Sequence, residues 1–265
     1  MGQGVFAWLQ EGGHGRSNAG VVIDADGVTV IDTLMVESQW KPFAAAVEAI
    51  GAPIPRCVLT SSHLEFVGGT PVFWRAGMYG RAMTSNHLDQ PPNPNLLRRL
   101  HPDFAGEIND ELTTRPITHV VDEASYLSGA AMAVPTGGQQ RENLMVMVPG
   151  ADVLFAGAMC SFGTTPLAFD GDPAMWAAAL ADIGGMATTI VPGHGPIGGA
   201  SDVEALRQYL LAVVAAEGDP NAIEAGPWDT WHDRDVDAIN VERAAMLAVG
   251  DPNPPPSLLR RLGVN

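Results

Sequence analysis

The chain has 265 residues, 46% of them hydrophobic and 17% charged, which is enough apolar sequence for one large α/β domain with its own core. Its formal net charge of −16 at pH 7 opposes binding to nucleic-acid phosphates or to an anionic membrane surface, so neither partner is expected. The sequence has no apolar run of about 18 residues and does not begin like a signal peptide, and its two cysteines suit a reducing compartment. We therefore expect a cytoplasmic protein.

The first 60 residues alternate between strand and turn patterns. Asp26-Gly27 between two β-branched runs is a strong hairpin signal. Ser38 stands where the N-cap of a helix is expected, because the apolar residues after it have helical spacing. The patterns predict strands over residues 5–9, 19–23, 28–32 and 57–60, and a helix over residues 38–50.

The middle of the chain contains a long polar stretch, residues 84–116, that is rich in Pro and Asn. An irregular segment of this length in a compact domain usually serves function, for example as a pocket lid or an interface. Residues 72–83 are expected to form a helix end and a short strand. We expect strands over 117–121, 130–134, 143–148, 152–156 and 187–191, and helices over 96–100, 174–183 and 201–216.

From residue 218 onward the composition changes, with a helical pattern over 235–249 followed by a Pro-rich tail. Trp228 and Trp231 lie in a polar stretch, which is typical of aromatic residues that anchor an interface. We interpret residues 1–217 as the main domain. Residues 218–265 are expected to be an extension packed on that domain or on a neighbouring subunit, and not an independent domain.

Residues 60–69 read Thr-Ser-Ser-His-Leu-Glu-Phe-Val-Gly-Gly and follow an apolar strand. This stretch resembles the motif T-H-x-H-x-D-H-x-G-G of metallo-β-lactamase-fold hydrolases. Other segments are similar to further landmarks of that family: residues 17–20, residues 30–33 with Asp32 as a support of the metal loop, residues 143–157, and the P-G-H-G stretch at 192–195. The resemblance implies an α/β fold, the four-layer αββα sandwich.

The resemblance also indicates which metal ligands have been replaced. In the family, three His hold one metal, an Asp and two His hold the second, and a further Asp bridges the two ions. At these positions the chain has Ser61, His63 and Gln139 or Gln140 for the first metal, Glu65, Phe66 and His194 for the second, and Ala158 in place of the bridge. Without the bridging carboxylate nothing holds two ions about 3.5–4 Å apart, so we expect no metal bound by this chain.

The remaining residues allow three other arrangements. His63, Glu65 and His194 form a two-His, one-carboxylate set that would suit a single metal ion. The same three side chains are also expected to form hydrogen bonds with one another if no metal binds. In an extended segment Ser61 and His63 share a face, which would allow Ser61 as a nucleophile, His63 as its base and Glu65 as the group that orients the base.

The remaining histidines have simpler interpretations. His14, in a Gly-rich turn, could project over the mouth of a pocket, but a solvated loop position is favoured. The sequence gives no role to His87, His101, His119 or His232.

The resemblance implies a function in which the scaffold is kept and the metal centre is lost. We expect the chain to be the non-metal-bearing subunit of a hetero-oligomeric hydrolase, with zinc in a paralogous partner subunit of the same fold. The substrate would be a small molecule, an aryl ether or ester of the kind met in nitroaryl-ether demethylation and catabolism. The alternatives are an autonomous divergent hydrolase that uses a mononuclear or metal-free site at His63, Glu65 and His194, and a ligand-binding or assembly protein without catalysis.

Overall fold

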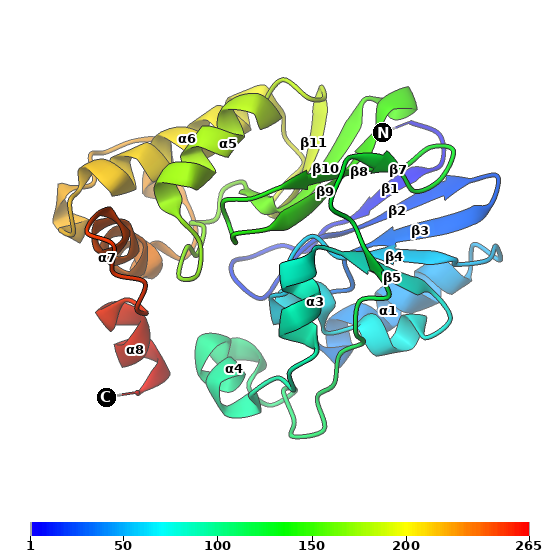
Figure 1. The fold of residues 1–265 in the computed structure, drawn as a ribbon, viewed down its shortest axis with the longest axis horizontal. Coiled ribbons are helices and arrows are strands. Elements are labelled where there is room, and N and C mark those ends of the chain that lie inside the picture. The colour runs from blue at the N-terminus through cyan, green and yellow to red at the C-terminus, as the bar shows by residue number, and fades with distance from the viewer. Residues whose placement is uncertain (1, 265) are drawn as a thin grey trace.

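A computed structural model, which describes residues 2–264, shows two β-sheets packed face to face with helices on their outer sides (Figure 1). The six-stranded sheet has the order β1-β2-β3-β4-β5-β6, and the five-stranded sheet has the order β11-β10-β9-β8-β7. The strands of the first sheet are β1 (Val5–Trp8), β2 (Ala19–Asp24), β3 (Gly27–Ile31), β4 (Arg56–Val58), β5 (Gly77–Gly80) and β6 (His119–Val120). Those of the second are β7 (Ser125–Tyr126), β8 (Met132–Thr136), β9 (Asn143–Val148), β10 (Val153–Ser161) and β11 (Thr189–His194).

The helices follow the predicted order, with additional short ones. The α-helices are α1 (Glu37–Glu48), α2 (Leu64–Val67), α3 (Ala82–Leu88), α4 (Pro94–Leu100), α5 (Pro173–Ile183), α6 (Ala200–Ala215), α7 (Asp237–Ala248) and α8 (Pro256–Leu262). Short 3₁₀ turns cover Thr70–Phe73, Pro102–Phe104, Pro149–Ala151, Pro220–Ala222, Pro227–Thr230 and Arg234–Val236. Within residues 2–264, no helix has the length and apolar content needed to span a membrane.

Three apolar clusters fill the spaces between the four layers. One lies between α1 and the outer face of the six-stranded sheet and contains Phe43 and Val30. A second, with Phe155 and Val22, lies between the two sheets. The third packs α5 and α6 on the five-stranded sheet around Trp176. Each sheet is therefore buried on both faces, as in an αββα sandwich.

The hairpin prediction is confirmed, whereas the start of the first helix differs from the prediction. Strands β2 and β3 pair antiparallel, with Asp24 opposite Gly27. Ser38 is not the N-cap of α1, because the helix begins at Glu37 and its N-cap is Val36. The Ser38 hydroxyl instead donates a hydrogen bond to Glu107 at 2.8 Å. Gln39 supplies the local polar contact instead: its side-chain oxygen accepts hydrogen bonds from the backbone N–H of Met35 and Val36.

The C-terminal extension packs on the main domain of the same chain. Helix α7 contacts α5 and α6, and α8 contacts α4. The Pro-rich tail contains α8, which sequence patterns did not predict; its first residue is a proline, a position where the missing N–H costs nothing.

The prediction that Trp228 anchors an external interface is wrong. This side chain is buried within the chain against Tyr209 of α6, with 5.9 Å between the ring centroids. The Trp231 ring lies against the same tyrosine, at 5.6 Å.

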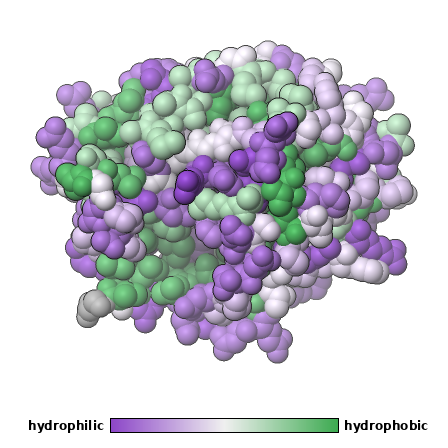
Figure 2. All heavy atoms as spheres, viewed as in Figure 1, coloured by the Kyte–Doolittle hydropathy of each residue, from purple (hydrophilic) through white to green (hydrophobic). Residues whose placement is uncertain are grey.

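Residues 84–116 are more ordered than their composition suggested. They contain α4 and the end of α3, and their side chains form one wall of a cavity. The expectation that this segment serves a pocket is therefore supported by its position. Figure 2 shows apolar side chains gathered around a hollow in this part of the surface.

Candidate functional site

The motif residues lie in a cavity of about 340 Å³ at the ends of β4, β10 and β11. Five connecting segments surround it, because the ends of these strands meet at one edge of the two sheets. Leucines of α4 form an apolar wall, and five histidines contribute to the polar surface. The polar lining comprises His14, Ser62, His63, Glu65, His87, Gln90, Asn93, His101, Thr114, Gln139, Gln140, Ser161, Asp170 and His194.

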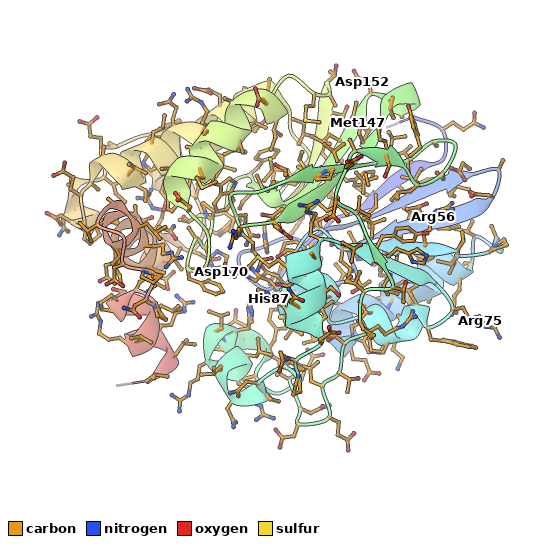
Figure 3. All side chains as sticks on the ribbon, viewed as in Figure 1. Arg56, Arg75, His87, Met147, Asp152 and Asp170 are labelled. Carbon is orange, nitrogen blue, oxygen red and sulfur yellow. The ribbon has the colours of Figure 1, made fainter. Side chains whose placement is uncertain are left out.

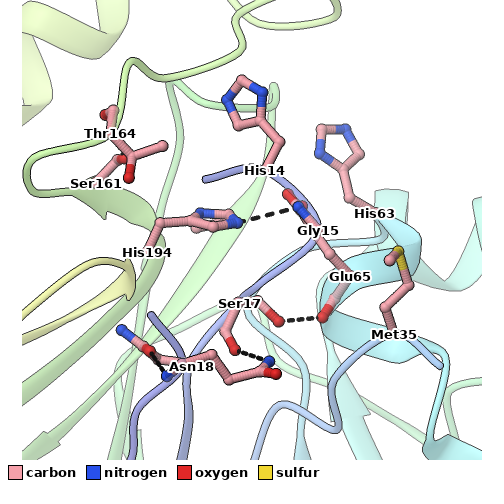
Figure 4. Close-up of polar contacts among 12 residues, drawn as sticks. His14, Gly15, Ser17, Asn18, Met35, His63, Glu65, Ser161, Thr164 and His194 are labelled. Carbon is pink, nitrogen blue, oxygen red and sulfur yellow. Dashed lines mark hydrogen bonds and ion pairs between the residues drawn. The ribbon is translucent and has the colours of Figure 1, made fainter. Parts of the chain in front are cut away.

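Glu65 and His194 form a buried ion pair at the base of this cavity (Figure 4). Glu65 lies in α2 and His194 ends β11, and 3.2 Å separates the imidazole Nε2 from the carboxylate. The backbone N–H of Gly15 donates a second hydrogen bond to the same carboxylate oxygen at 3.0 Å. Burial alone would raise the pKa of Glu65, but the imidazoles of His194, His101 and His14 outweigh it and hold that pKa well below its usual range.

Two further histidines surround this pair. The His14 side chain is only 11% exposed and lines the cavity, and its Nε2 donates to the carbonyl of Thr165 at 2.7 Å, so the expectation of a solvated loop histidine is wrong. His101 is 7% exposed, and its Nδ1 is buried without a hydrogen-bond partner among the described residues. Burial lowers the pKa of His14, and it lowers that of His101 to about 4. Both imidazoles are therefore uncharged at neutral pH.

His63 belongs to a second pair, with Asp170. The imidazole Nε2 lies 3.0 Å from a carboxylate oxygen of Asp170, the Gln139 amide donates to Nδ1 at 3.0 Å, and the ring stacks on Phe169. Burial would lower the pKa of His63, but the charge of Asp170 and its hydrogen bond raise it overall.

Sequence reasoning missed Asp170. Asp170 lies in the loop just before the N-cap of α5, and this position is the one sequence feature that could have indicated a role for it. Nothing in the sequence relates it to His63, which lies 107 residues earlier.

Gln139 and Gln140 bind the motif loop through hydrogen bonds of their side-chain amides. The side-chain oxygen of Gln140 accepts from the hydroxyl of Ser61 at 2.9 Å and from the backbone N–H of Ser62 at 3.1 Å. Its amide nitrogen donates to Asp170 at 2.9 Å. Gln140 therefore joins the motif loop to the carboxylate that pairs with His63.

These contacts decide between the arrangements predicted for the motif. The Ser61–His63–Glu65 array does not form, because the His63 ring pairs with Asp170 while Glu65 pairs with His194. The hydroxyl of Ser61 is directed to Gln140, and its only contact with His63 is to the backbone N–H. Of the predicted contacts among His63, Glu65 and His194, only that between Glu65 and His194 is present.

The residues present do not fit a dizinc centre. The Phe66 ring meets His194 edge to face with centroids 5.7 Å apart, where the family would place an imidazole, and Ala158 has no carboxylate to bridge two ions. Both ring nitrogens of His63 already have partners. In the part of the chain that the structure describes, no three His, Cys, Asp or Glu side chains are grouped to hold a metal ion.

The support beneath the motif loop is nevertheless complete. Asp32 at the end of β3 is buried and accepts hydrogen bonds from the backbone N–H and the hydroxyl of Thr60, both at 2.8 Å. Burial raises the pKa of Asp32 to about 7, against the opposing effect of these two hydrogen bonds. The loop is thus held in place by buried hydrogen bonds from its first residue.

No model of a known protein family matches the chain. Its fold is similar to solved structures of metallo-β-lactamases. The mono-zinc form of FIM-1 from Pseudomonas aeruginosa aligns with 22% identity, a TM-score of 0.61, and coverage of 80% of this chain and 92% of that one. DIM-1 aligns with 17% identity, a TM-score of 0.61, and coverage of 80% of this chain and 94% of that one. A metallo-β-lactamase from Hirschia baltica aligns with 17% identity, a TM-score of 0.59, and coverage of 79% of this chain and 94% of that one. At these identities the likeness establishes the fold, and the predicted αββα sandwich is confirmed.

Proposed function

We propose that this chain of the metallo-β-lactamase fold is the subunit without a dizinc centre in a hetero-oligomeric hydrolase, and that its cavity binds a small, mainly apolar substrate. One contrast supports this function: the scaffold around the cavity is intact, whereas the positions that bind metal in similar hydrolases hold other residues or paired histidines. The Asp32–Thr60 support and the cavity are kept, whereas the remaining motif histidines are paired with Glu65 and Asp170.

The lining of the cavity favours an aryl ether or aryl ester as the substrate class. Small-molecule sites are typically apolar pockets with a few directed polar groups, and a volume of about 340 Å³ suits a compound of roughly one aromatic ring. The ring of Phe169 and the leucines of α4 offer apolar contacts to such a ring. The imidazole of His101 lines the same cavity and adds a polar group to its wall.

The surface also has features that suit a partner subunit. Strand β1 is an edge of the six-stranded sheet, and Phe6 and Leu9 at this edge are 55% and 45% exposed. Exposed apolar side chains on a sheet edge are typical of protein contacts. The partner we propose is a paralogous chain that keeps its zinc ligands and supplies the metal-activated water.

The test compares the chain alone with the chain co-expressed with a paralogue that carries the full ligand motif. We expect the lone chain to contain well below one metal ion per chain and to leave 4-nitrophenyl methyl ether intact. The co-purified assembly is expected to contain zinc and to release nitrophenol. A Leu97→Trp variant, which fills the cavity, should assemble normally and still lose turnover, with Leu211→Trp on the exposed face of α6 as the matched control. A paralogue that is fully active without this chain would refute the proposal.

A second candidate function, autonomous hydrolysis, is favoured by the His63–Asp170 pair. This imidazole faces the cavity, has a raised pKa and is oriented by a carboxylate, which are the properties of a general acid. Ether cleavage by the lone chain that is lost in His63→Ala would support it. If chelation also removes the activity, a metal ion takes part, and the mononuclear set His63, Glu65 and His194 would have to form by breaking the His63–Asp170 pair.

A third function, ligand binding without catalysis, predicts that calorimetry detects a bound compound while neither the lone chain nor an assembly turns it over.

A further inference from the structure

A serine–histidine pair outside the family's ligand positions lies on the wall of the same cavity. Ser62 is in the loop between β4 and α2, and His87 is in the last turn of α3. The hydroxyl oxygen of Ser62 and Nδ1 of His87 are 2.6 Å apart, and both residues line the cavity. We propose that Ser62, with His87 as its base, is a nucleophile that takes an acyl group from small activated esters bound in the cavity.

The contacts of the Ser62 hydroxyl determine where its proton points. Two acceptors lie within reach, Nδ1 of His87 at 2.6 Å and the side-chain oxygen of Gln140 at 3.2 Å. The shorter contact, to the more basic atom, takes the proton. The amide nitrogen of Gln140 donates to the same hydroxyl oxygen at 2.9 Å and so fixes its position. A hydroxyl held against an imidazole in this way meets the geometric requirement for an activated nucleophile.

A carboxylate lies close enough to stabilise the imidazolium that forms during attack. Figure 3 shows His87 and Asp170 facing the same space, and Asp170 is joined to the pair through Gln140 at 2.9 Å. Burial would raise the pKa of Asp170, but the imidazoles of His63 and His87, together with hydrogen bonds, keep it below its usual value. Asp170 is therefore an anion at neutral pH, and its negative charge can stabilise the imidazolium that forms transiently during attack.

The reaction has two steps. The Ser62 oxygen attacks the ester carbonyl carbon, its proton passes to Nδ1 of His87, and the bond from carbon to the leaving oxygen breaks as His87 returns the proton to that oxygen. The product is an acyl ester of Ser62 and an alcohol or phenol. A water molecule, deprotonated by His87, then attacks the acyl carbon, and the Ser62 oxygen leaves and regains a proton, so that a carboxylic acid is released.

The neighbouring serine provides a matched control. Ser61 is fully buried, and its hydroxyl donates to the side-chain oxygen of Gln140. It therefore lacks both exposure to the cavity and a base, so an alkyl fluorophosphonate should react with Ser62 and not with Ser61. In that reaction the serine oxygen displaces fluoride from phosphorus and the proton goes to His87.

The experiment incubates the purified full-length chain, without any partner, with an alkyl fluorophosphonate and measures the intact mass and the modified peptide. We expect one adduct per chain, located on Ser62, absent in Ser62→Ala and retained in Ser61→Ala. His87→Gln should slow labelling by at least about 100-fold, the usual contribution of a general base. Circular dichroism and thermal melting establish that each variant is folded.

Two results with the wild-type chain alone would overturn the proposal: a folded chain that carries no label after incubation, or a label that lies on a residue other than Ser62. Labelling that His87→Gln leaves unchanged would also overturn it, because the base would then have no role. This reaction requires neither a partner nor ether cleavage. Its failure therefore leaves the hetero-oligomer proposal standing, and the failure of that proposal leaves this one standing.

Discussion

The buried carboxylate of Asp32 makes stability depend on pH in a direction opposite to that of most acidic residues. The side chain is 1% exposed and carries no ion pair, and its partners are the N–H and hydroxyl of Thr60. Replacement by Asn keeps the shape and an acceptor for the Thr60 N–H while removing the charge. The Asp32→Asn variant therefore isolates the free-energy cost of ionising this carboxyl group inside the protein.

The size of the effect follows from the two pKa values. The carboxyl group titrates at about 7 in the folded protein, compared with 3.8 for an unperturbed aspartate. Between these values the folded state binds more protons than the unfolded state, so the free energy of unfolding falls as pH rises. A separation of about three pH units corresponds to about 4 kcal/mol, lost between about pH 4 and pH 8.

The assay is urea unfolding of wild type and Asp32→Asn at several pH values across this window. We expect the free energy of unfolding of the variant, relative to wild type, to rise by about 4 kcal/mol toward high pH. The control is Asp26→Asn: Asp26 pairs with Arg56 and its pKa is lowered to about 2, so its effect should be confined to acid and have the opposite sign. A difference between Asp32→Asn and wild type that does not change with pH would refute the reasoning.

Three other substitutions probe the site and the extension. Glu65→Gln should destabilise the fold by about 3 kcal/mol at pH 7, because it removes the buried carboxylate that accepts from His194 and from the backbone N–H of Gly15. The difference in unfolding free energy between this variant and wild type should become smaller when unfolding is measured at acid pH. The pKa of Glu65 is lowered in the folded protein, so the ionised carboxylate stabilises the fold above the pKa of the unfolded chain and stops doing so as pH falls. Phe66→Ala should cost about 3–5 kcal/mol, measured by calorimetry, because the ring is fully buried; a smaller loss would mean that the cavity collapses. Arg243→Ala removes hydrogen bonds from α7 to three backbone carbonyls. It should cost about 2–4 kcal/mol and speed proteolysis of the tail, and unchanged proteolysis would contradict this role.

The elements that could be predicted from the sequence are those fixed by local chemistry. The Asp26-Gly27 turn specified the β2–β3 hairpin, and the helical spacing of apolar residues located α5 and α6 within one or two residues. The short helices α3 and α8 were missed, because Pro and Asn around them resemble loop composition until tertiary contacts hold the turns in place.

Long-range side-chain partners were decided by the tertiary structure. The sequence alone showed that His63, Glu65 and His194 are present and that Ser61, Phe66 and Ala158 lie in the same motifs, because that depends only on which residue stands at which position. It did not determine that His63 pairs with Asp170, 107 residues away, or that Ser62 meets His87. Backbone geometry and apolar periodicity act over a few residues, whereas the partner of a buried imidazole depends on which loops the packed sheets bring to the same edge.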